Sequence, residues 1–284
     1  MPKSMYVSKD VSSLEQQMRQ ALLGVCRDYL RRSLPVRRLS PVLKLLAWSA
    51  TWQNDEALFE SLTTRIVEER QADGGWTDCE ESAWHLLALR SLLARQQSHF
   101  ALSETWLYQE RVQQGWGYSR RDHPNIPITS LVRMALEVPD DDPSSTWLQL
   151  TWENDMHAMF QLSYKAAWYL LARADTPADS KLAHATVRHL LADQRDDGGW
   201  GPWRVHPAAT DCFATGIALL ALGMEPLANT SAVERCVMRG LGWIAANILD
   251  TGLFPTHYIE FGSAWLLAAL SLCSTRWGIT SLSH

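Results

Sequence analysis

Residues 194–200 read Gln-Arg-Asp-Asp-Gly-Gly-Trp, and residues 71–76 read Gln-Ala-Asp-Gly-Gly-Trp. Each phrase is followed by Thr-Asp-Cys, at 210–212 and 77–79, and then by a small-residue and apolar run that ends in Leu-Leu-Ala-Leu. A phrase that recurs in register with its flanking run indicates a repeat architecture, and the repeat determines the fold. Because glycine past a helix end adopts the left-handed conformation that caps it, we interpret the phrase as structural. Its aspartates are therefore not expected to be catalytic; they are Asp73, Asp196 and Asp197.

Helical periodicity runs along nearly the whole chain, and strand signals are almost absent. We predict twelve helices in six pairs. The first members lie near 13–32, 55–70, 101–113, 143–150, 178–194 and 231–249, and the second members near 40–52, 79–95, 127–137, 154–172, 211–222 and 259–274.

The two series of helices differ in their content of charged and apolar residues, and this difference predicts which series is buried. The first series carries more charge, and the second is richer in small and apolar residues, so the second should be buried. This predicts an all-α fold, an (α/α)6 toroid with an inner and an outer ring. We expect residues 1–12 to form a flexible N-terminus and residues 13–284 to form a single domain, because no linker divides them.

Composition excludes several classes of partner. The 26 basic and 31 acidic residues give a net charge of −5, which gives no reason to expect nucleic acid. The five cysteines are scattered and form no CxxC pair, as is typical of a reducing cytoplasm. The polar N-terminus and the short apolar runs predict a cytoplasmic protein with no signal peptide and no transmembrane segment. Oligomeric state is left open. Most of the 14 tryptophans are expected to pack the repeat, and a few to line an aromatic cavity.

The Gly-Gly-Trp phrase with its following Ser82-Ala83-Trp84 and Leu-Leu-Ala-Leu resembles the QW repeat. That repeat is found in squalene–hopene cyclases and the wider terpene cyclase and protein prenyltransferase β-subunit group. The resemblance covers about residues 60–274. It implies an enzyme of specialised, natural-product metabolism that binds an apolar polyene or isoprenoid-like molecule in a central cavity. The reaction it implies is an acid–base cyclisation, isomerisation or elimination.

The acid motif of the class II cyclases is replaced in this chain. Their Asp-x-Asp-Asp opens one inner helix, and its aspartates would fall on Asn125, Pro127 and Ile128, none of which supplies a proton. The stretch Asp140-Asp141-Asp142-Pro143 has a similar look, but it follows an inner helix. We interpret it as an acidic loop and N-cap before the helix at Ser144.

The inner-helix starts should form a polar rim above an apolar cavity, a common arrangement for small-molecule sites. A carboxyl group there could act as general acid or base when burial raises its pKa. The candidate catalytic residues are Asp211, Asp78, His257, His206 and Glu260. Alternative interpretations stay open: helix capping for the aspartates, and a solvated or core position for the histidines. The candidate substrate-binding residues are Trp76, Cys79, His123, Asn125, Tyr164, Trp168, Cys212 and Tyr258.

Two other functions remain open. Resemblance to the prenyltransferase β-subunits implies a zinc site, for which Asp211, Cys212 and His257 are weak candidates because Thr210 holds the position of the family's aspartate. No cofactor is favoured. A toroid that binds a lipid or a partner protein without catalysis is the third hypothesis.

Overall fold

The structure is a computed structural model. It describes residues 8–49, 55–92, 100–158, 161–173, 181–203, 207, 209–226, 230–256 and 259–283. The chain forms two compact units. The first takes in residues 1–25, 162–167 and 178–284, and the second residues 26–161 and 168–177. The prediction of a single domain over 13–284 stays a prediction.

Twelve α-helices lie within the described residues and follow the six predicted pairs. The first members are α1 (Val11–Arg31), α3 (Glu56–Glu68), α5 (Ala101–Gln109), α7 (Pro143–Asp155), α9 (Lys181–Asp193) and α11 (Ser231–Asn247). The second members are α2 (Ser40–Trp48), α4 (Cys79–Leu92), α6 (Ile126–Leu136), α8 (Ser163–Leu171), α10 (Cys212–Met224) and α12 (Ile259–Trp277). A short 3-10 helix, η1 (Val36–Arg38), precedes α2, and the strands β1 (Ser8–Asp10) and β2 (Ser281–Ser283) pair antiparallel.

One helix boundary was predicted wrongly. The sequence predicted a break near 150–154, but α7 continues to Asp155 and α8 begins only at Ser163. The continuation of α7 buries Trp152, which lies one turn beyond the buried Leu148 on the same face. That shared buried face keeps the helix intact beyond the predicted end.

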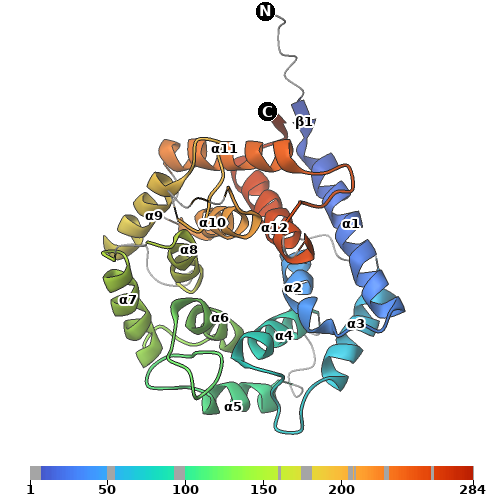
Figure 1. The fold of residues 1–284 in the computed structure, drawn as a ribbon, viewed down its shortest axis with the longest axis vertical. Helices are drawn as coiled ribbons and strands as arrows, with labels where there is room; N and C mark the ends of the chain where they lie inside the picture. Colours follow the sequence, from blue (N-terminus) through green and yellow to red (C-terminus); the bar gives the residue numbers. More distant parts are fainter. Residues whose placement is uncertain are drawn as a thin grey trace, which may run out of the picture. The chain divides into compact units, whose positions relative to one another are not determined.

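In the first unit, α10 and α12 pack against each other, and α11 packs on both (Figure 1). Every residue of α10 from Ala214 to Gly223 is buried. Gly216 makes the close approach of the two helices feasible, because a Cβ there would lie 2.6 Å from the Cβ of Trp265. Within this unit, the structure confirms the prediction that the second helix of each pair, which is richer in small residues, is buried.

In the second unit, α4 packs between α2 and α6, while α3, α5 and α7 contribute a second layer (Figure 1). α4 is buried from Ser82 to Leu89, whereas α3 buries only one face. The same division into buried inner-layer helices and half-exposed outer-layer helices therefore holds in this unit.

The two Gly-Gly-Trp phrases join α3 to α4 and α9 to α10. The indole N–H of Trp76 donates to the Ile66 carbonyl at the end of α3 at 3.0 Å, and that of Trp200 donates to the Leu190 carbonyl of α9 at 2.8 Å. The Trp76 backbone N–H donates to the Ser82 hydroxyl at 2.9 Å. The structural role predicted for the phrase is confirmed.

The glycines of the phrase lie in the turn after the helix rather than at its cap, which corrects the expected position. Gly74 and Gly198 have φ values of 102° and 96°. The turn is closed by bonds from Gly74 N–H to Gln71 O and from Gln71 N–H to Gly75 O. A Cβ at Gly74 would also lie 2.6 Å from the Leu102 carbonyl oxygen, so both the conformation and the space require glycine.

Among the helices that the structure describes, none is both long enough and apolar enough to cross a membrane.

Candidate functional site

Three inner-layer helices begin with the same hydrogen bond. The side chains of Asp78, Asn125 and Asp211 each accept from the backbone N–H three residues later, at 2.8, 3.0 and 2.8 Å. These bonds satisfy N–H groups that a helix start leaves without partners. The capping interpretation of both aspartates is therefore confirmed, and the register that aligned them is correct. Asn125 occupies the start of α6, where the resemblance placed the first missing aspartate.

The hydroxyls next to these caps define which side of each inner-layer helix faces outward. Thr129 and Thr215 accept from the backbone N–H of Trp116 and Trp200, each at 2.9 Å, as Ser82 does from Trp76. Each residue turns an α-helix by about 100°, so residues two positions before these hydroxyls lie on nearly the opposite side. Those residues are Glu80, Pro127 and Phe213. On α12, Ser263 makes the same bond to Phe254 N–H at 3.1 Å, and the corresponding residue is Phe261.

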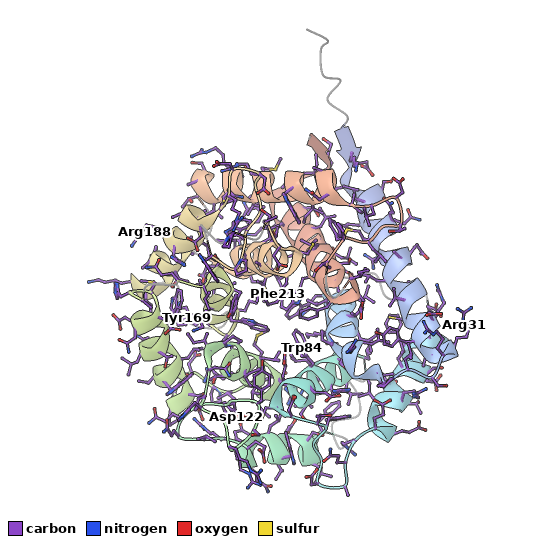
Figure 2. All side chains as sticks on the ribbon, viewed as in Figure 1. Arg31, Trp84, Asp122, Tyr169, Arg188 and Phe213 are labelled. Atoms are coloured by element: carbon purple, nitrogen blue, oxygen red, sulfur yellow. The ribbon has the colours of Figure 1, made fainter. Side chains whose placement is uncertain are left out.

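We call the side of each inner-layer helix away from these hydroxyls its inner face. On α4 it carries Glu80 and, four residues later, Trp84. Figure 2 labels Trp84 on α4 and Phe213 on α10. Trp84 packs against Trp168 with ring centroids 6.2 Å apart and planes at 60°. Trp168, a predicted substrate-binding residue, therefore lies beside the inner face of α4.

Glu80 is a potential acid that the sequence reading missed. Its side chain is partly exposed. Burial, together with the neighbouring carboxylates of Asp78 and Glu81, raises its pKa to about 7. The repeat register contains a signal for this position, because Glu80 aligns with Phe213 and Phe261. Glu80 and Phe213 each lie one position after an aligned cysteine and two after a capping aspartate.

In the first unit the inner faces carry an aromatic cluster, formed by Tyr164, Phe213, Phe261 and Trp265. Phe213 stacks on Phe261 with centroids 5.5 Å apart and lies 6.2 Å from Tyr164. Trp265 meets both phenylalanines edge to face. Trp265 is fully buried, whereas the other three rings are partly exposed. Tyr164, a predicted substrate-binding residue, thus belongs to an apolar surface that a ligand can touch.

The two cysteines that follow the capping aspartates are unreactive in this environment. Burial raises the pKa of Cys79 to about 12, with the carboxylates of Glu110, Asp78 and Asp122 adding to the shift. Burial, with Asp211 adding, raises the pKa of Cys212 to about 12. Neither thiol ionises near neutral pH, so neither is a nucleophile as it stands.

The other predicted site residues lie in different surroundings. Trp76 is buried and stacks on His85 at 4.6 Å, on the outward side of α4. His123 is exposed in the loop before α6, and Glu260 is partly exposed in the first turn of α12. His206, His257 and Tyr258 lie outside the described residues.

The acidic stretch before α7 is structural. Asp142 is the N-cap, accepting from Ser144 N–H at 2.8 Å, with Pro143 in the first turn. Arg111 donates to both of its carboxylate oxygens, at 2.7 and 3.0 Å. Burial would raise the pKa of Asp142, but the bonds from Arg111 and Ser144 outweigh it and hold the pKa at about 2. The N-cap interpretation is confirmed.

The zinc hypothesis is not decided by these positions. Its ligand set needs His257, which lies outside the described residues. Among the residues that are described, no three His, Cys, Asp or Glu side chains are placed to hold a metal ion. Asp211 also commits one carboxylate oxygen to the α10 cap.

Comparison with known proteins gives no sequence relative. No protein-family model matches the chain, and no curated protein matches it significantly.

Solved structures are similar along nearly the whole chain. A variant of type II terpene cyclase MstE from Scytonema, in complex with geranylgeranyl dihydroxybenzoate as substrate, aligns at a TM-score of 0.73 and 12% identity, covering 93% of this chain and 99% of that chain. A protein from Actinoplanes aligns at a TM-score of 0.72 and 14% identity, covering 93% and 100%. A glycosidase aligns at a TM-score of 0.58 and 12% identity, covering 95% and 98%.

These identities show a shared fold and leave the reaction to the site, since unrelated chemistries use one scaffold. The chain therefore has the all-α toroid fold of the type II terpene cyclases, as its repeat predicted.

Proposed function

We propose that this protein is a terpene-cyclase-like enzyme that binds an apolar, isoprenoid-like molecule and transforms it by acid–base chemistry. The observation that carries the proposal is the aromatic cluster, in which three partly exposed rings project from the inner faces of neighbouring helices. Partly exposed aromatic rings suit an apolar chain, and their faces attract positive charge.

The structural neighbours support the same substrate class. MstE variants have been solved with geranylgeranyl dihydroxybenzoate as substrate and with merosterolic acid A as product. A prenylated aromatic compound is therefore the first probe to try, with squalene as an apolar probe that lacks a head group.

The test is conversion in deuterated water. A reaction that begins with protonation of an alkene and ends with loss of a proton gives a product isomeric with its substrate. One solvent hydrogen stays in that product. Mass spectrometry should therefore show an unchanged product mass in ordinary water and one added deuterium in D2O. Conversion without deuterium would contradict acid–base initiation.

A variant of the aromatic cluster tests the binding surface. Removing the central ring in Phe213→Ala should raise KM about ten-fold, because about 1.4 kcal/mol of apolar contact is lost. Tyr108→Ala removes an exposed ring from the outer-layer helix α5 and should leave KM unchanged. Equal effects of the two variants would contradict the assignment.

The non-catalytic hypothesis gives a different result in the same assays. It predicts that intrinsic tryptophan fluorescence reports saturable binding of the prenylated probe without any product. The zinc hypothesis predicts about one equivalent of zinc in protein purified without chelators.

A further inference from the structure

We propose that Glu80, in the first turn of α4, is the proton donor of this enzyme. The acid motif of the class II cyclases would lie at a different helix, α6. This inference rests on the proposed function and names the residue that starts its reaction. The motif's own positions at α6 hold Asn125, Pro127 and Ile128, so an acid has to come from elsewhere.

Glu80 lies on the inner face of α4. Ser82, two residues later, points outward and binds the Trp76 backbone, so Glu80 points to the inner face. Trp84, one turn further on, shares this face and packs against Trp168. Helix periodicity therefore places Glu80 one turn from a buried pair of tryptophans, while its own side chain is partly exposed.

Three carboxylates near the start of α4 have structural partners. Asp78 caps α4, Asp122 accepts from the Ser119 hydroxyl, and Glu110 pairs with Arg120 at 2.9 Å. Within the part of the chain that the structure describes, the Glu80 side chain makes no hydrogen bond and no ion pair.

The surroundings of Glu80 raise its pKa, so a substantial fraction of the carboxyl group is protonated at neutral pH. The charged groups that act on it, Asp78 and Glu81, are both acidic, and burial adds to their effect so that the pKa is about 7. Two cations that contact α4 or belong to it, Lys44 and Arg90, lie toward its other end. Lys44 of α2 donates to Ser91, and Arg90 pairs with Glu104 of α5 at 2.6 Å.

The step balances without a co-reactant. The O–H bond of the Glu80 carboxylic acid breaks as the alkene's π electrons form a new C–H bond, which leaves a carboxylate and a carbocation. Ring closure moves the cation along the substrate, and loss of a proton to water quenches it. Solvent then returns a proton to Glu80, so substrate and product are isomers.

The experiment is turnover of the prenylated probe in D2O by Glu80→Gln, with substrate binding measured alongside by fluorescence titration. The amide has nearly the shape of the acid but cannot donate this proton. We expect the rate of deuterated product to fall by about 100-fold or more while Kd stays within a few-fold. Glu81→Gln, the matched control one residue away, should retain wild-type turnover at about pH 6, where Glu80 is protonated in both proteins.

The pH profile gives a second readout that a purely structural role would not move. Wild-type kcat should fall as pH rises through about 7, because only the protonated acid is active. Removing the Glu81 charge lowers the Glu80 pKa, so the fall should begin at lower pH in Glu81→Gln. This readout holds even where Glu80→Gln does not fold.

The outcomes separate the two proposals. Wild-type turnover that persists in Glu80→Gln overturns the role of Glu80 and leaves the proposed function standing. A profile that is unchanged in Glu81→Gln also overturns it. A wild-type protein that converts neither probe overturns the proposed function itself.

Discussion

At the scale of single residues, Asp211 shows how capping and chemistry can be separated. Its carboxylate accepts from Ala214 N–H at 2.8 Å, and asparagine caps a helix about as well as aspartate. We expect Asp211→Ala to lower the free energy of unfolding by about 1 kcal/mol and Asp211→Asn to change it little, measured by denaturant titration. Because Asp211→Asn keeps the cap, any loss of turnover in it reports chemistry. Full turnover in both Asp211→Asn and Asp78→Asn would contradict a catalytic role for these two residues.

At the scale of elements, the sequence predicted all six helix pairs because the repeat carries its own register. The break between α7 and α8 was misplaced because burial of Trp152, a tertiary effect, extends α7. The site was harder to predict. Capping residues are visible in the sequence, but the pKa of Glu80 depends on how many protein atoms surround it. The register of the sequence repeat is enough to show that Glu80 and Phe213 hold equivalent positions. It cannot show that the pKa of Glu80 is raised.

The two tryptophans that donate to carbonyls near the ends of α3 and α9 give a prediction for these elements. Trp76→Phe and Trp200→Phe each keep a ring but remove the N–H that satisfies a helix-end carbonyl, Ile66 O or Leu190 O. Each change should lower the free energy of unfolding by about 1–3 kcal/mol, since a buried acceptor loses its partner. Trp147→Phe, at a partly exposed position of α7, is the control and should change stability by less than about 0.5 kcal/mol. Equal losses in all three variants would mean that ring size, and not the hydrogen bond, decides.

At the scale of the whole molecule, terpene cyclases and a glycosidase share one scaffold. The fold therefore restricts the possible reactions less than the protonation states of the side chains do. All five cysteines are free and buried. Burial raises the pKa of each of them to about 12. A zinc-bound Cys212 would instead be a thiolate. The zinc hypothesis and the acid–base proposal therefore differ in their thiol chemistry.

Thiol titration with a disulfide reagent turns this difference into a prediction. In the native protein we expect no thiol to react quickly, because thiolate is the reactive form and is nearly absent in all five cysteines. Unfolding should release all five. Adding a chelator to the native protein should change nothing if no metal is bound. A single thiol that becomes reactive only after chelation, together with about one equivalent of released zinc, would favour the zinc hypothesis over the proton donor.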